Sequence, residues 1–219
     1  MQMPKIFIVI PAHNEERHIG EVVKKAISFG RVIVVNDGSK DSTAEKAKEQ
    51  GAEVITHIIN LGKGAALKTG CDYAMKQGAS QLIALDADSQ HDPEEIPKFL
   101  AALKEADMAF GYRSFSKEMP LILRIGNWAI SKMTKFLFGA DIYDTQSGYR
   151  AFTSAAYKKI RWESSSYSME SEMIANMARH NLKYSQIPIK TIYADRYKGT
   201  TILDGFKIVL NLLWWKITK

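Results

Sequence analysis

The sequence is short of the features that mark secreted, disulfide-bonded and membrane-spanning proteins. Its 219 residues contain one cysteine, Cys71, which excludes an intramolecular disulfide framework and fits a reducing cytosol. No apolar run reaches the roughly 18 residues that a membrane-spanning helix needs. The first apolar run, residues 6–10, is too short for a signal peptide. We therefore expect a cytoplasmic protein that is either soluble or bound peripherally to the cytoplasmic face of a membrane.

Acidic residues are scarce in the second half of the chain. Residues 1–119 hold 15 Lys and Arg against 17 Asp and Glu, whereas residues 120–219 hold 15 against 7. The overall charge of +6 therefore comes from the C-terminal part, which we expect to face an anionic membrane surface or another polyanion. No recognised nucleic-acid-binding motif is present, so we do not expect that polyanion to be a nucleic acid.

Short apolar segments alternate with helical patterns between residues 6 and 111. Strands are expected over residues 6–10, 32–35, 53–57, 81–85 and 108–111. Asn14 is expected to cap a helix to about residue 29, and Ser42 and Glu45 form a capping box for a helix to about residue 50. Asp92 is expected to cap a further helix that ends near residue 104. Repeated strand–helix units predict an α/β fold with a mostly parallel, doubly wound sheet and flanking helices.

A polar cluster follows each of these strands. The clusters are residues 11–15, 36–39, 60–64, 86–88 and 111–113. In an open α/β sheet, ligands bind where the carboxyl ends of the strands meet. Any single cluster is explained by capping or turn chemistry, but five at one edge predict a binding site.

Two carboxylates, Asp86 and Asp88, follow an apolar strand one residue apart. In an extended segment, residues two apart project to the same side, so both carboxylates can face one hard divalent cation. Phosphate and water oxygens would complete its coordination. This edge is therefore a candidate site for a metal-bound nucleoside diphosphate.

Other candidate residues have simpler explanations. Lys63 lies between two glycines, but the spacing of a phosphate-binding P-loop is absent, so we expect it only to start a helix. His57, His91 and His180 lack the spacing of metal ligands and are expected to be solvated or to cap helices.

Four motifs together resemble family 2 glycosyltransferases of GT-A fold. Residues 11–15 (Pro-Ala-His-Asn-Glu) resemble the opening motif of that family, and residues 34–43 resemble its second motif. The segment Asp86-Ala87-Asp88-Ser89-Gln90 looks like its metal motif. Residues 144–150 (Asp-Thr-Gln-Ser-Gly-Tyr-Arg) are similar to an element of the branch that transfers sugars to polyprenyl phosphates, the dolichyl-phosphate mannose synthase type. The resemblance runs from about residue 5 to residue 201 and implies a catalytic domain over residues 1–201.

The resemblance implies roles for particular residues. Five residues would line the base and ribose pocket of the nucleotide: Pro11, His13, Glu15, Asp37 and Ala87. Within this set, Asp37 would accept a hydrogen bond from a base N–H. A metal group would hold Mg²⁺ or Mn²⁺: Asp86, Asp88 and Gln90. A catalytic group would include two arginines, one meeting a phosphate and one closing over the site: Asp86, Asp88, Arg113, Asp144 and Arg196. An acceptor group would meet the lipid phosphate: Arg124, Ser131, Ser147 and Arg150.

The reaction implied is a metal-dependent, inverting transfer of a hexose from a UDP- or GDP-linked sugar to a polyprenyl phosphate. An ionised acceptor phosphate needs no strong general base, which fits the lack of an obvious Ser-His-Asp or Cys-His set. Two departures from the family pattern leave the donor open: Asn36 replaces a common Asp, and Ile202 follows Thr201 where a Ser-Lys pair is typical. Three alternatives are kept: a non-lipid acceptor, a haloacid-dehalogenase-like phosphatase, and a non-catalytic nucleotide-binding module.

Two helical patterns in the second half are basic and rich in aromatic residues. In residues 121–138, polar side chains recur every three or four positions, and no acid lies between Glu118 and Asp141. Residues 203–217 repeat this pattern with two adjacent tryptophans. We expect residues 119–138 and 202–219 to form amphipathic helices at a membrane interface. The alternative is packing in the core or in a homo-oligomer.

Overall fold

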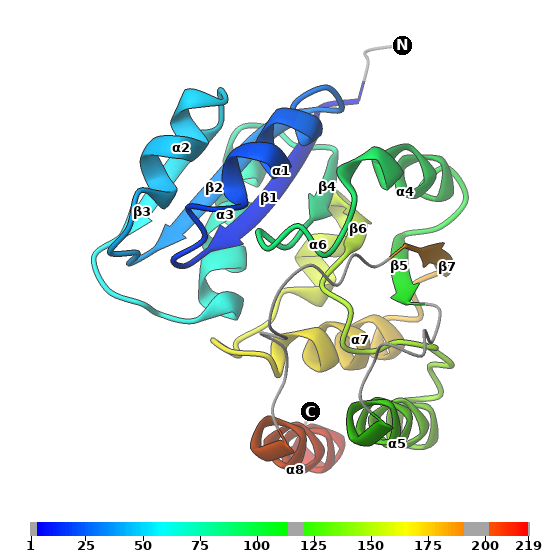
Figure 1. Ribbon diagram of the computed structural model, residues 1–219. Coiled ribbons are helices and arrows are strands. Elements are labelled where there is room, and N and C mark those ends of the chain that lie inside the picture. Colours follow the sequence, from blue (N-terminus) through cyan, green and yellow to red (C-terminus); the bar gives the residue numbers. More distant parts are fainter. Residues whose placement is uncertain (1–3, 114–120, 191–201, 219) are drawn as a thin grey trace.

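The computed structural model describes residues 4–113, 121–190 and 202–218, which form a seven-stranded sheet flanked by helices (Figure 1). The strands are β1 (Ile6–Ala12), β2 (Arg31–Asp37), β3 (Glu53–His57), β4 (Gln81–Ala84), β5 (Met108–Arg113), β6 (Arg150–Thr153) and β7 (Tyr184–Ile189). Their order is β3-β2-β1-β4-β6-β5-β7. Only β6 runs antiparallel to its neighbours among these strands. The expected GT-A architecture with a mostly parallel sheet is confirmed.

Helices cover both faces of the sheet (Figure 1). They are α1 (Ile19–Ala26), α2 (Thr43–Glu49), α3 (Lys63–Lys76), α4 (Ile96–Ala102), α5 (Leu121–Phe138), α6 (Ser154–Ile160), α7 (Met169–Arg179) and α8 (Ile202–Thr218), with a short 3₁₀ helix at Pro93–Glu95. One core lies between the sheet and α1 and α4, and a second lies between the sheet and α3, α6 and α7. Both cores are built from strand side chains that alternate between the two faces of the sheet.

One of the three expected helix starts is wrong, and a second has the expected position but lacks the expected cap bond. Asn14 adopts a left-handed φ of 54° and accepts from the Lys40 N–H, so it joins two loops at the sheet edge, and α1 begins only at Ile19. Ser42 is the N-cap residue of α2 as expected, but its side chain makes no cap bond, and Asp41 accepts from the Thr43 N–H. The third start is confirmed, since Asp92 accepts from the Glu94 N–H.

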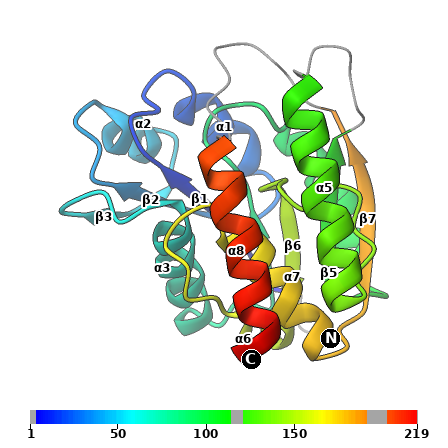
Figure 2. The same cartoon turned by 90° about the horizontal axis from the view of Figure 1, so that it is seen from below.

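The helices α5 and α8 lie side by side and form an outer layer against α7 (Figures 1 and 2). We call this pair the α5–α8 layer. It has a small core of its own, to which Ile130, Ile208, Leu212 and Trp215 contribute buried side chains. Within the described residues, neither of these helices nor any other is long and apolar enough to cross a membrane.

Candidate functional site

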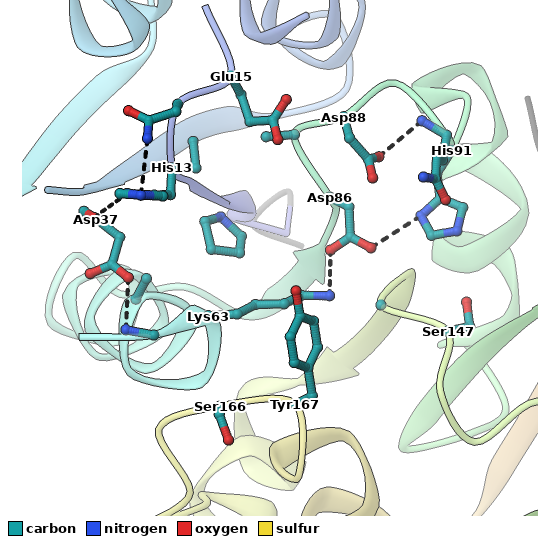
Figure 3. A pocket seen from close by; sticks show the side chains of 18 of the residues that line it. His13, Glu15, Asp37, Lys63, Asp86, Asp88, His91, Ser147, Ser166 and Tyr167 are labelled. Carbon is teal, nitrogen blue, oxygen red and sulfur yellow. Dashed lines mark hydrogen bonds and ion pairs between the residues drawn. The ribbon is translucent and has the colours of Figure 1, made fainter. Parts of the chain in front are cut away.

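A cleft of about 560 Å³ opens at the carboxyl edge of the sheet (Figure 3). It is formed by the segments at the carboxyl ends of β1, β2, β3, β4 and β5 and by the turns before β6 and α7. The expected site residues that line it are Pro11, His13, Glu15, Asp37, Asp86, Ala87, Asp88, Gln90, Arg113 and Ser147. The polar clusters that follow five strands therefore meet in one place.

The segment after β1 is joined to the end of β2. The His13 ring nitrogen Nδ1 lies 2.7 Å from the carbonyl oxygen of Asp37. The Asp37 carboxylate is turned away from that contact and accepts three hydrogen bonds, one from His57 and two from the backbone at Leu61 and Gly62. His57 is thus a structural partner of a site residue, which corrects the expectation that it is solvated or caps a helix.

Lys63 lies in the cleft and bonds Asp86 (Figure 3), and it also bonds the carboxylate of Glu170. Its Nζ is 2.7 Å from Asp86 Oδ1 and 3.1 Å from Glu170 Oε1. Burial raises the pKa of Asp86, but the Lys63 ammonium outweighs this and holds that pKa below its ordinary value. Burial lowers the pKa of Lys63, but Asp86 and Glu170 raise it by more. The pKa therefore lies above its ordinary value, and the lysine is charged. Lys63 starts α3 as expected, and it is also a site residue, which the sequence reasoning missed.

Asp88 lies beside this ion pair with a different electrostatic balance. Burial, and then the charge of Asp86, raises the pKa of Asp88 to about 6. Its carboxylate accepts from the Gln90 N–H at 3.0 Å. A cation near Asp86 and Asp88 would favour the ionised form of both, and carboxylate oxygens suit Mg²⁺ or Mn²⁺. No group of three or more His, Cys, Asp and Glu side chains is arranged to hold a metal in the described ranges, so phosphate oxygens or water would complete the coordination.

His91 packs against Asp86, although we expected it to be solvated or to cap a helix. The side chain is 4% exposed, with Nδ1 3.7 Å from Asp86 Oδ2. Burial lowers the pKa of His91 to about 4, so the ring is neutral at pH 7. Gly148 closes the other side of Asp86, because a Cβ there would lie 2.4 Å from Asp86 Oδ2. A larger residue at position 148 would displace the carboxylate.

Arg113 is oriented by a buried partner. Its Nε donates to Asp144 Oδ2 at 2.6 Å, and its Nη2 donates to Asp144 Oδ1 at 3.0 Å. Asn127 of α5 also donates to this carboxylate at 3.0 Å. Burial raises the pKa of Asp144, but Arg113 outweighs it and the pKa is lowered. Asp144 is 2% exposed and does not line the cleft, so its described role is to hold Arg113 in position.

The expected acceptor residues do not gather in one place. Arg150 is 1% exposed and donates to the backbone carbonyls of Thr145, Ser147 and Glu170. Its guanidinium is therefore occupied inside the protein, and the expectation that it meets the acceptor phosphate is wrong. Ser131 faces Tyr143 and Thr145 outside the cleft.

Ser147 does line the cleft, and its hydroxyl has no hydrogen-bond partner among the described residues. The Arg124 side chain and all of Arg196 lie outside the part of the chain whose placement is described.

Two further site residues carry no sequence signal of their own. Glu170 lies at the start of α7 and reaches Lys63, at the start of α3, from a distant part of the sequence. Tyr167 lines the cleft, with the Lys63 ammonium 5.9 Å from the centre of its ring. Nothing in their local sequence separates them from ordinary helix and turn residues. The signal for Lys63 was its place in the polar cluster that follows β3.

Comparison with known proteins agrees with this geometry. Residues 7–161 match the family model for glycosyl transferase family 2. UDP-N-acetylglucosamine–dolichyl-phosphate N-acetylglucosaminyltransferase of Methanococcus voltae is 33% identical, over 98% of this chain and 97% of its own. A dolichyl-phosphate hexose transferase of Haloferax volcanii is 31% identical, over 91% of this chain and 86% of its own.

A solved structure shares the fold. Glucosyl-3-phosphoglycerate synthase from Mycobacterium tuberculosis, in complex with Mn²⁺, UDP and phosphoglyceric acid, superposes with a TM-score of 0.77 at 18% identity. The match covers 99% of this chain and 80% of that one. These relatives confirm the resemblance that the motifs indicated, and they exclude the phosphatase and the non-catalytic module. The chain is a glycosyltransferase and belongs to glycosyl transferase family 2.

Proposed function

We propose that the protein transfers a hexose from a nucleotide sugar to a polyprenyl phosphate at a membrane surface, with a divalent cation held at Asp86 and Asp88. The observation that carries this proposal is the convergence of two carboxylates with Lys63 and Arg113 on one cleft. Such a cleft offers a metal site and two cationic groups, which suit a donor diphosphate and an acceptor phosphate.

The chemistry requires stabilisation of the departing nucleoside diphosphate. When bound, the cation neutralises charge that develops on the diphosphate. Lys63 adds a fixed positive charge from the floor of the cleft, and no water has to reorganise around it during the reaction. Gln90, which follows the two carboxylates, would complete the metal group from the protein side.

The acceptor phosphate is ionised at pH 7, so it can attack the anomeric carbon directly and invert its configuration. Arg113, held by Asp144, is the described cation best placed to orient that phosphate. We keep Ser147 in the acceptor group because it lines the cleft and its hydroxyl has no hydrogen-bond partner among the described residues. Arg124 and Arg196 stay in the proposal on the family resemblance alone.

The polyprenyl acceptor is supported by the names of the two relatives that act on dolichyl phosphate. It is also supported by the α5–α8 layer, from which large apolar side chains project into solvent. Trp128, Phe136, Trp214 and Ile217 are 59%, 88%, 63% and 83% exposed. Lys132, Lys207 and Lys216 are exposed on the same two helices. Aromatic and basic side chains together suit the interface of an anionic membrane.

The proposal is tested by assaying the purified protein with a panel of nucleotide sugars and Mg²⁺ or Mn²⁺. Polyprenyl phosphate in vesicles is compared with a short water-soluble alcohol as the acceptor. We expect transfer to the lipid phosphate and its loss in excess EDTA. Full activity in EDTA would contradict the metal site, and equal transfer to the soluble alcohol would favour a non-lipid acceptor. In that case the α5–α8 layer would be an oligomer contact, and residues 202–219 would not be a membrane-associating segment.

A further inference from the structure

One oxygen of the Asp37 carboxylate is fully occupied. Oδ1 accepts from His57 Nδ1 at 2.7 Å and from the Leu61 N–H at 2.9 Å. Oδ2 accepts from the Gly62 N–H at 2.8 Å. Each carboxylate oxygen has two acceptor positions. Within the described part of the chain, Oδ1 is therefore saturated, and Oδ2 keeps a single acceptor position at the wall of the cleft.

The hydrogen bond from His57 does not depend on its protonation state. A carboxylate only accepts, so Nδ1 must carry the proton that lies between His57 and Asp37. The other ring nitrogen, Nε2, lies 3.0 Å from the Thr69 hydroxyl, which can donate to a neutral ring or accept from a charged one. In both states Oδ1 of Asp37 stays saturated.

The loop that supplies the two backbone donors is held from both sides. At Gly38, with φ +69°, a Cβ would lie 2.6 Å from the backbone nitrogen of Asn60. At Gly62, with φ +96°, a Cβ would lie 2.5 Å from the Ser165 carbonyl oxygen. Because both contacts are with backbone atoms, the loop cannot move away from Asp37 at low cost. The fold therefore fixes the positions of the backbone N–H groups that bond the Asp37 carboxylate.

We infer that this arrangement selects uracil as the base of the nucleotide and rejects guanine, with His57 as a specificity-determining positioning residue. Uracil presents one N–H between two carbonyl groups, which matches the single open position on Oδ2. Guanine presents two adjacent donors, and pairing both would need both carboxylate oxygens. With Oδ1 saturated, the second guanine donor would be buried without a partner. Cytosine presents an acceptor at the same place and would face the carboxylate lone pair.

This inference rests on the proposed use of a nucleotide sugar and narrows its donor to a uridine diphosphate sugar. It is tested by calorimetric titration of the full chain, at one Mg²⁺ concentration, with UDP, GDP, CDP and UDP methylated at N3. We expect UDP to bind about tenfold or more tightly than the other three, because each of them leaves a buried polar group unpaired. Equal or tighter binding of GDP, or tight binding of N3-methyl UDP, would overturn the inference while leaving sugar transfer intact. Failure of every nucleotide to bind would instead remove the proposed function.

A pair of variants isolates the part played by His57. His57→Leu removes one donor from Oδ1 and opens a second acceptor position, so we expect the preference for UDP over GDP to shrink severalfold. Thr69 lies beside Nε2 of His57, the ring nitrogen that does not bond Asp37, so Thr69→Val serves as the matched control. We expect its preference for UDP over GDP to stay near that of the unmodified chain. Circular dichroism checks that both variants are folded. A folded His57→Leu variant with an unchanged UDP-to-GDP ratio would refute the role of His57, and the N3-methyl UDP comparison tests the inference even if that variant does not fold.

Discussion

The cleft and the α5–α8 layer hold their charged side chains in opposite ways. In the cleft, each of the charges at Lys63, Asp86 and Arg113 is paired with another over 2.6–3.1 Å and is at least three-quarters buried. In the layer, Lys132, Lys207 and Lys216 are exposed beside apolar side chains that solvent also reaches. Paired, buried charges are sensitive to the loss of one partner, whereas exposed charges contribute little singly. The properties of the cleft therefore depend on individual charged residues, whereas those of the α5–α8 layer depend on its overall content of basic and apolar side chains.

The largest expected effect is on turnover when the metal group is disrupted. Asp88→Asn removes a carboxylate charge at the proposed cation site with little change in volume, so we expect transfer to fall about 100-fold or more. A radiolabelled-sugar transfer assay measures this, with thermal melting to check the fold. Asp107→Asn, at the opposite end of β5, is the control, since the Asp107 carboxylate accepts from the Lys183 N–H and does not line the cleft. Unchanged turnover of Asp88→Asn would remove the metal assignment.

The same substitution made in both regions sharpens the comparison. Lys63→Met removes a buried cation from two carboxylates, and we expect nucleotide affinity to drop roughly 10- to 100-fold, since a charge-assisted hydrogen bond is worth about 1.5–3 kcal/mol. Lys132→Met on α5 is expected to leave that affinity unchanged. Titration calorimetry with the nucleotide measures both. If the two variants lost nucleotide affinity to a comparable degree, the expected difference between a lysine of the cleft and a lysine of the layer would be contradicted.

Substitutions of the exposed apolar side chains in the α5–α8 layer are expected to affect membrane binding only. Phe136→Ser and Trp214→Ser should each weaken binding to vesicles with anionic lipid by about tenfold, because each removes a large side chain that would be buried in the interface. Ile58→Ser, at a side chain that is 99% exposed on the loop after β3, is the matched control. Vesicle sedimentation at low and high salt measures the effect. Deletion of α8 is a poorer test, because α8 buries Ile208, Leu212 and Trp215 against its neighbours.

The smallest expected effect is a pH dependence of stability that belongs to the cleft. Burial and Asp86 raise the pKa of Asp88 from 3.8 to about 6, so the folded chain holds this proton more tightly than the unfolded chain does. Ionisation of Asp88 therefore lowers stability as the pH rises from about 4 through about 6. In EDTA, Asp88→Asn should raise the melting temperature more at pH 7.5 than at pH 5, by about 2–4 °C for each kcal/mol relieved.

Exposed acids should show no such pattern. Glu105→Gln, at an exposed position after α4, is the control and is expected to change the melting temperature equally at both pH values. If Asp88→Asn also gave equal changes at pH 5 and pH 7.5, the raised pKa of Asp88 would be contradicted.

Most of the first half of the fold was predictable from local patterns. The strand at Glu53–His57 has the expected bounds, and the helix at Leu121–Phe138 falls within the expected residues 119–138, because apolar periodicity and flanking turn residues are properties of short segments. The pattern did not reveal β6 as an antiparallel strand between β4 and β5, since strand order depends on how distant segments pack. It also misplaced the cap of α1, because Asn14 bonds a loop that lies 26 residues away in sequence.

The sequence by itself determined which residues end the strands, and the carboxyl edges of parallel strands bring those residues to one cleft. It therefore located Asp37, Asp86, Asp88 and Arg113. Only the tertiary structure decided what surrounds them: Glu170 against Lys63, and three donors on Asp37. It also decided that Arg150 turns inward to three carbonyls. Local pattern reports which side of an element a residue occupies, whereas pairing inside a low-dielectric interior depends on partners that only the packed chain brings within bonding distance.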